Sequence, residues 1–275
     1  VNAVRGRGTF VVAKEPTAPV KTSIGFVLRP HRYIEEDPFY SQVLMGVTQE
    51  AQRRRIHLAF VSGEYIEDET HSYEHYQILQ HLAGIIIAGQ MPKDFLDHIE
   101  RIRIPCVFLN YRSSEYPFDT VTADQEEIGK LLGDHLASLG HRRCLYLSGE
   151  ADNVAYEARL KGFQETFLSD SRSLTVLKGG KDVESGRRMI QQALANGTSF
   201  TAVAGGNDTI AIGAMNELLD CGYRIPEEIS VCGIDDVPFA ENCRPALTTV
   251  RIEKQEMGIK ALQYLLERLK NPRKV

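Results

Sequence analysis

The sequence has no long apolar run and little excess charge of either sign. No stretch of about 18 consecutive apolar residues occurs, as a membrane-spanning helix would require, and no signal-peptide or lipidation motif is present. The 275 residues carry 32 basic and 37 acidic side chains, a net charge of -5, so the chain has no global basic footprint for nucleic acid. Secretion and contact with a membrane are therefore unsupported, and we expect a cytoplasmic protein.

Motifs for metal binding and for common enzyme chemistry are also missing. The odd number of cysteines, scattered through apolar runs without CxxC spacing, predicts buried thiols in a reducing compartment; they are Cys106, Cys144, Cys221, Cys232 and Cys243. No GxGxxG follows a strand, and GxxxxGK[ST], GxSxG and HExxH do not occur. His71 and His75 have i,i+4 spacing but no nearby third ligand, which favours a solvated helix face. We expect neither a metal nor a cofactor.

Apolar, strand-like runs alternate with helical patterns along the chain. Strands are expected at 20–28, 56–61, 84–88, 105–109, 144–148, 174–178, 200–204 and 229–234. Helices are expected at 39–51, 73–82, 95–101, 124–139, 155–168, 184–195, 209–221 and 256–269. This alternation indicates βαβ units on parallel sheets, and it restarts after Asp124. The prediction is an α/β fold of two similar doubly wound parallel-sheet lobes joined by a hinge.

Polar pairs stand at the ends of two consecutive strand-like runs. Asn207 and Asp208 follow 200–204, whereas Asp235 and Asp236 follow 229–234. The carboxyl ends of parallel strands face the crevice where open α/β sheets bind ligands. The alternative is that the first pair caps the next helix and the second pair makes a turn. For one pair the two interpretations are about equal, but two pairs on consecutive strands favour a binding site.

Other polar and aromatic groups are expected near strand ends or at the start of a helix. They are Asp37, Phe39, Tyr40, Asn110, Tyr111 and Arg159. A sugar needs this mixture, because carboxylates and amides accept hydrogen bonds from hydroxyls, an arginine fork holds paired oxygens, and an aromatic face covers the C–H surface of the ring. No activated nucleophile or base with an orienting partner accompanies the set. We therefore expect binding without catalysis.

Several segments between Thr22 and Leu269 form one further pattern. They read IGFV (24–27), DPFY (37–40), HLAGIIIAG (81–89), IPCVFLN (104–110), HLASLGHRRCLYLSG (135–149), RLKGF (159–163), NDTIAIGAM (207–215), IPEEISVCGIDDVP (225–238) and LTTV (247–250). Together they resemble the effector domain of the LacI/GalR transcription regulators, which shares the periplasmic sugar-binding protein fold. The chain departs from that family at Asn110, where Asp is commonest, and at Tyr111, where Arg often follows. These departures leave the identity of the effector open.

The resemblance implies an effector cleft between the lobes. Its residues would be Asp37, Phe39, Tyr40, Asn110, Arg159, Asn207 and Asp235, with Asp124 and Tyr111 as additional candidates. Asp124 has the alternative role of capping a helix. The first lobe would comprise 22–123 plus 251–275, and the second lobe 124–250. The resemblance also implies a homodimer formed through the lobe-one helices at 40–53 and 73–82, and a small-molecule effector such as a sugar.

Residues 4–11 read VRGRGTFV and resemble the end of a GntR-type winged helix. Arg5, Gly6, Arg7 and Gly8 would then lie close to DNA, since glycine allows a close backbone approach and arginine suits the negative potential of the minor groove. The alternative is a flexible basic leader. With 1–21 as the end of the wing and a linker, we expect most of an operator-binding domain to precede Val1, as in the arabinose repressors of some bacteria.

The leading hypothesis is therefore the ligand-sensing domain of a bacterial transcription regulator, most simply a repressor. A periplasmic sugar-binding protein that serves a transporter is the alternative. The cysteines, the missing secretion signal and the VRGRGTFV segment argue against that alternative. A sugar-processing α/β enzyme is a third class, and it would require turnover of the bound sugar.

Overall fold

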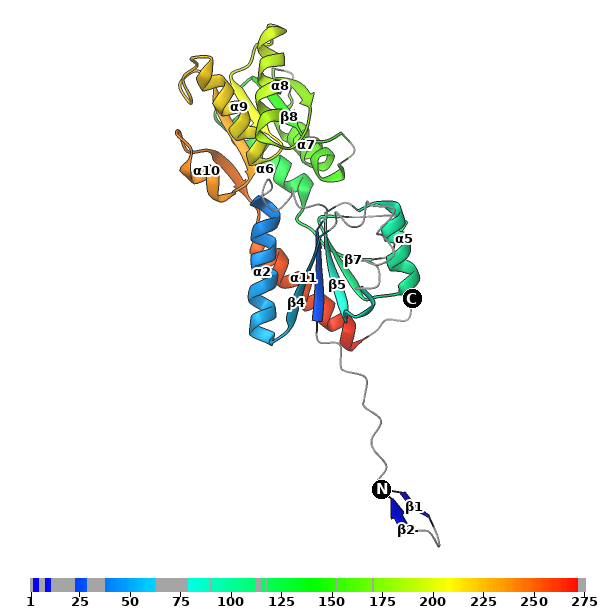
Figure 1. Cartoon of the computed structure of the whole chain (residues 1–275). Coiled ribbons are helices and arrows are strands. Elements are labelled where there is room, and N and C mark those ends of the chain that lie inside the picture. The colour runs from blue at the N-terminus through cyan, green and yellow to red at the C-terminus, as the bar shows by residue number, and fades with distance from the viewer. Residues whose placement is uncertain are drawn as a thin grey trace.

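The computed structural model describes residues 2–4, 8–10, 23–28, 38–62, 79–89, 91–111, 115–116, 118–151, 153–169 and 171–271. Arg5, Gly6, Arg7, Asp37 and the histidines at 71 and 75 lie outside these ranges. The described residues form two lobes, each built on a five-stranded parallel sheet with flanking helices (Figure 1). This confirms the predicted fold class. Separately, β1 (Asn2–Val4) pairs with β2 (Gly8–Phe10) as an antiparallel hairpin.

The sheet of lobe one has the spatial order β4-β3-β5-β6-β7. Its strands are β3 (Ser23–Leu28), β4 (His57–Ser62), β5 (Gly84–Ala88), β6 (Cys106–Leu109) and β7 (Asp119–Val121). Helices α2 (Pro38–Arg54) and α11 (Lys254–Lys270) cover one face, and α5 (Lys93–Ile102) covers the other. In β5, Ile86 packs toward α2 and α11, whereas Ile85 and Ile87 pack toward α5. This strand is continuously apolar because both of its faces are buried.

Lobe two repeats this plan with the order β12-β11-β10-β8-β9. Its strands are β8 (Arg143–Ser148), β9 (Ser173–Lys178), β10 (Ala202–Gly205), β11 (Ser230–Asp235) and β12 (Thr248–Arg251). Helices α6 (Gln125–Ser138) and α7 (Val154–Phe167) cover one face, α8 (Val183–Ala195) and α9 (Asp208–Asp220) cover the other, and α10 (Pro238–Asn242) precedes β12. In both lobes the first strand lies between the second and the third, so both sheets place their switch point there.

The described chain crosses between the lobes twice. Residues 122–124 lead from β7 into α6, and residues 252–253 lead from β12 into α11. In each lobe the helix that follows a crossing packs against the helix that follows the first strand. Glycines allow the close approach of these pairs. A Cβ on Gly46 or Gly258 would lie 2.0 or 2.1 Å from a carbonyl oxygen of the partner helix, and one on Gly129 or Gly162 would lie 1.9 Å from such an oxygen.

The structure differs from the sequence-based expectations in the burial of the cysteines and in three short elements. Cys106, Cys144 and Cys232 are buried thiols, but Cys243 is half-buried and Cys221 is exposed. The prediction is wrong for Cys221 because α9 ends at Asp220 and the next residue, its C-cap, faces solvent. The short elements β7, α10 and β12 were not expected from the sequence. Among the described helices, none combines the length and apolar character needed to cross a membrane.

Candidate functional site

A cavity of about 110 Å³ lies between the two lobes, at the carboxyl ends of both sheets. Lobe one contributes Phe39, Tyr40, Gly89, Asn110 and Tyr111. Lobe two contributes Asn153, Val154, Ala155, Tyr156, Arg159, Lys181, Asn207 and Asp235. Six of the seven residues predicted for the effector cleft line this cavity, and so does Tyr111. The seventh, Asp37, lies outside the described residues, and whether the six contact an effector stays a prediction.

Arg159 connects the parts of lobe two that form the floor of the cavity. It is only 5% exposed. Its Nε donates to Gln125 Oε1 at 2.7 Å, its Nη1 donates to the Gly206 carbonyl at 2.7 Å, and its Nη2 donates to Asp235 Oδ1 at 3.1 Å. The Tyr156 ring lies 5.7 Å from its guanidinium carbon. Three of the five N–H donors of Arg159 therefore have protein partners, and Arg159 connects α7 to α6, to the residue after β10 and to β11.

Asp235 and Asn110 occupy equivalent positions in the two lobes, at the ends of β11 and β6, which are the fourth strands of their lobes. Both have left-handed backbones, with φ of 117° and 53°. Such conformations are uncommon outside glycine and gather at functional sites. Burial raises the pKa of the Asp235 carboxyl, and the charges of Arg159 and Lys254 partly offset that rise. Within the described chain this carboxylate has one hydrogen bond, to Arg159, so its second oxygen keeps its capacity to accept.

Asn207 lines the cavity but has a structural role as well. Its Oδ1 accepts from the Ile210 amide at 2.7 Å and caps α9, as the alternative interpretation expected. Its Nδ2 donates to the Tyr156 hydroxyl at 2.9 Å and to the Lys181 carbonyl at 3.1 Å. Because both ends of the amide have protein partners, Asn207 shapes the wall of the cavity in this arrangement.

The acidic neighbours of Asn207 and Asp235 lie outside the cavity lining. Asp208 is fully buried and accepts from the Val237 amide at 2.9 Å and from the Thr249 hydroxyl at 2.5 Å. Burial and the nearby Asp235 carboxylate raise the pKa of Asp208 to about 7. Asp236 instead pairs with Arg251 at 2.6 Å near the surface. Each polar pair thus divides into one residue that lines the cavity and one that supports the fold.

Tyr156 is a cavity residue that sequence reasoning missed. It is the third residue of α7, just as Tyr40 is the third residue of α2. A Cβ on Gly206 would lie 3.0 Å from the Tyr156 ring, and a Cβ on Gly89 would lie 3.2 Å from the Tyr40 hydroxyl. Each lobe therefore places a tyrosine of the helix after its first strand against a glycine just after its third strand. The repeated order of strands and helices would have pointed to Tyr156 as the counterpart of Tyr40. Nothing at position 156 alone indicates a cavity residue.

A second cavity of about 350 Å³ adjoins the first at the crossing 122–124. The two cavities share Asn110, Val154 and Ala155. Asp124 lines this second cavity and also caps α6, because its side chain accepts from the Glu127 amide at 3.1 Å. Both interpretations of Asp124 are therefore compatible with its position.

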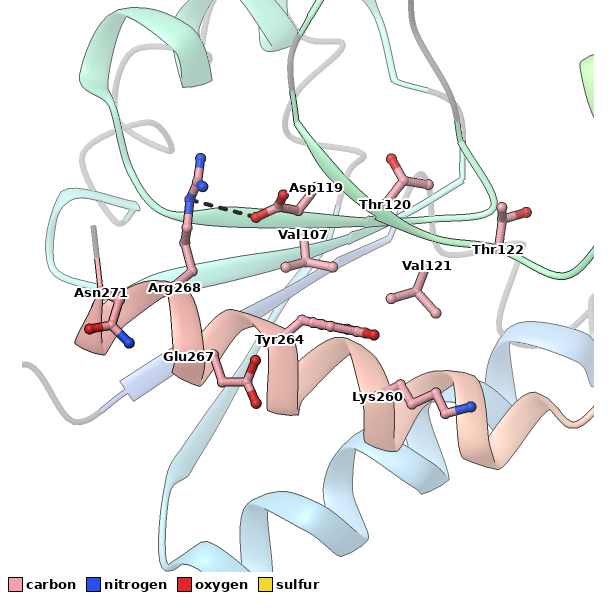
Figure 2. A pocket seen from close by; sticks show the side chains of 10 residues that line it. All are labelled: Val107, Asp119, Thr120, Val121, Thr122, Lys260, Tyr264, Glu267, Arg268 and Asn271. Atoms are coloured by element: carbon pink, nitrogen blue, oxygen red, sulfur yellow. Dashed lines mark ion pairs between the residues drawn. The ribbon is translucent and has the colours of Figure 1, made fainter. Parts of the chain in front are cut away.

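A third cavity, of about 500 Å³, lies on lobe one between β7 and α11 (Figure 2). Lys260, Tyr264 and Arg268 project from α11 along it, and Arg268 pairs with Asp119 at 3.6 Å. No residue predicted for the effector cleft lines this cavity. All of its residues come from one lobe or its adjoining crossing, so lobe rotation would change it little. The described part of the chain contains no cluster of three His, Cys, Asp or Glu side chains that could hold a metal ion.

Comparisons with known proteins agree with this arrangement. Residues 133–275 match the family model of the periplasmic binding protein-like domain. The chain is 26% identical over 263 residues to the HTH-type transcriptional repressor PurR of Mannheimia succiniciproducens, covering 94% of this chain and 78% of that one. It is 28% identical over 241 residues to the ribose operon repressor of Haemophilus influenzae, covering 86% and 72%. The structure of a LacI family transcriptional regulator from Enterococcus faecium with bound ribose has a TM-score of 0.78 at 26% identity and covers 92% of each chain.

These relatives are transcriptional repressors and regulators rather than enzymes. They support the interpretation as a regulator over the interpretation as a transporter's binding protein. They confirm the part of the prediction that assigns the chain to a periplasmic binding protein-like domain similar to those of LacI-type regulators. The comparisons give no support to the winged-helix part of that prediction.

Proposed function

The chain belongs to the family of periplasmic binding protein-like domains, and from this membership we propose that it is the ligand-sensing domain of a bacterial DNA-binding repressor whose effector is a sugar or a similar small polar molecule. The cavity between the lobes carries the proposal, because both lobes contribute side chains to it. A ligand that touches both lobes favours their closed arrangement. It shifts DNA affinity only as far as it discriminates between arrangements, typically by about 1–3 kcal/mol.

In this proposal the effector lies between aromatic and polar groups of the two lobes. Lobe one comprises 22–123 together with 251–275, and lobe two comprises 124–250. Lobe one would contribute Asp37, Phe39, Tyr40 and Asn110, and lobe two Arg159, Asn207 and Asp235. The second oxygen of Asp235 suits a hydroxyl donor, and the ring faces of lobe one suit the C–H surface of a sugar. Arg159 acts mainly by fixing the shape of the cavity floor, and Asn207 by fixing its wall.

The proposal includes a DNA-binding domain of the GntR type before this domain. Support comes from the β1–β2 hairpin, in which Ala3 stands opposite Thr9. A winged helix ends in such a hairpin, and in this proposal Arg5, Gly6, Arg7 and Gly8 are the residues close to DNA. We further propose a cytoplasmic homodimer that contacts DNA half-sites related by two-fold symmetry. Met45 of α2, which is 54% exposed, supports lobe one as the dimer surface.

A thermal-shift screen of the purified chain against pentoses, hexoses, disaccharides and nucleosides tests the proposal. A ligand that binds only the folded state raises the melting temperature by mass action. Asp235→Asn should then weaken binding of the best compound, measured by calorimetry at a temperature where the variant is folded. Asp236→Asn is the matched control, because its side chain lies next in sequence but outside the cavity. If no compound stabilises the wild type, or if both variants bind equally well, the proposed effector site is wrong.

A further inference from the structure

We infer that the effector site has a second compartment at the hinge, where Gln125 hydrogen-bonds an oxygen of the ligand's second unit. This inference rests on the proposed function and narrows it, since it points to a two-unit ligand such as a disaccharide or a nucleoside. Gln125 is the first residue of α6 and directly follows the crossing 122–124. It is 9% exposed and lines the 350 Å³ cavity.

The orientation of the Gln125 amide is determined by its neighbour. Its Oε1 accepts from Arg159 Nε at 2.7 Å. A guanidinium group has only donors, so the oxygen of the amide must face Arg159 and the NH2 group must point elsewhere. That Nε2 is buried and has no hydrogen-bond partner among the described residues. Buried donors in folded proteins are nearly always paired, so this one requires an explanation.

The position of the unpaired donor supplies the explanation. The hinge compartment shares Asn110, Val154 and Ala155 with the cavity at Arg159, so the two adjoin, and the inferred ligand extends across both. Nε2 is covered in the present arrangement. An acceptor reaches it when the compartment widens, and we place that opening between Asn110 of lobe one, with Thr122 of the crossing, and the small side chains Ala155 and Ala158 of α7 in lobe two. Binding there couples directly to rotation of the lobes.

The sizes of the two cavities agree with a two-unit ligand. Pockets for small molecules usually measure about 300–1,000 Å³. The cavity at Arg159 has only about 110 Å³ and falls below this range, whereas the adjoining compartment of about 350 Å³ brings the site within it. Thr122 and Asn110, which share a 3.3 Å hydrogen bond at the compartment, add polar groups that suit hydroxyls. A neutral, oxygen-rich second unit therefore fits better than an apolar one.

Gln125→Glu provides a selective test, because a carboxylate still accepts from Arg159 but replaces the free donor by an acceptor. The probes for calorimetry are D-ribose and D-glucose as one-unit compounds, and cellobiose, maltose and adenosine as two-unit compounds. We expect a two-unit probe to bind the wild type best. Gln125→Glu should weaken that probe about tenfold or more, while any binding of one-unit probes changes less than about twofold. Glu157→Gln, on the exposed side of α7, is the control for a change of charge.

Three results would overturn the inference: a one-unit probe that binds the wild type as tightly as any two-unit probe, equal weakening of both classes, or no weakening at all. Equal weakening would mean that Gln125 acts only by holding Arg159. Gln125→Met would then reproduce the effect, since it removes both hydrogen-bonding ends. Absence of binding for all five probes and for the wider screen would instead contradict the proposed function itself. Melting temperatures of the variants without ligand confirm that they fold.

Discussion

Asp208→Asn should remove a dependence of stability on pH that the buried carboxyl creates. The pKa of Asp208 rises from its ordinary value of 3.8 to about 7, first because of burial and second because of the nearby Asp235 carboxylate. The folded state therefore binds this proton more tightly than the unfolded chain does. The resulting stabilisation is fully present below pH 3.8 and is lost as the pH rises through 7.

The expected magnitude follows from the span between the two pKa values. Each pH unit within that span lowers the free energy of unfolding by about 1.4 kcal/mol. From pH 5 to pH 8 the loss is therefore about 3 kcal/mol, since the decline stops near pH 7. An asparagine can accept from the Val237 amide and donate to the Thr249 hydroxyl, which reproduces the hydrogen bonds of the protonated acid without a proton to lose.

Urea unfolding of the wild type and of Asp208→Asn at pH 5 and pH 8 provides the measurement. Subtracting the two free energies cancels groups that titrate equally in both proteins. The stability of the variant relative to the wild type should rise by about 3 kcal/mol between the two pH values. Asp134→Asn, on the exposed face of α6, reports the effect of removing a surface charge alone. A relative stability that does not change with pH would refute the reasoning.

Two further changes test the packing that positions the site. Gly129→Ala should destabilise the protein by about 1–3 kcal/mol, because the added Cβ would meet the Arg159 carbonyl oxygen of α7 at 1.9 Å. A free energy of unfolding equal to that of Asp134→Ala, a variant on the exposed face of the same helix, would contradict this. Lys254→Met should cost about 1–3 kcal/mol in urea unfolding, because the buried ammonium donates to the carbonyls of Ile252, Asp235 and Asp236. An unchanged unfolding midpoint for the second variant would mean that water replaces the ammonium.

The fold was predictable because its signal is spread over many residues. Alternating apolar runs gave the long strands and helices with errors of a few residues at their ends, as in α9, predicted at 209–221 and found at Asp208–Asp220. The short elements β7 and α10 escaped because three to five residues hold too little periodicity to distinguish them from a loop. The division into two lobes followed from the restart of the pattern at Asp124.

The cavity was predictable only where residues stand directly at strand ends. Asn110, Asn207 and Asp235 were found in this way. Gln125 and Tyr156 were missed, because their place at the cavity depends on how a crossing or a repeated helix is set against the sheet. Sequence position also could not tell that three N–H donors of Arg159 have partners in its own protein, since these partners are 34, 47 and 76 positions away.

The two crossings at 122–124 and 252–253 determine which motion an effector is able to drive. A single connection would leave one lobe free to swivel about every axis through that point. The two connections within the described residues fix the line that joins them, and they leave the angle about that line free. A ligand between the lobes then needs to favour one value of one coordinate, and none of its binding energy is spent on suppressing the other two rotations. The displacement at any point of lobe one grows with its distance from that line, so a small change of angle at the cavity becomes a larger shift at the far surface.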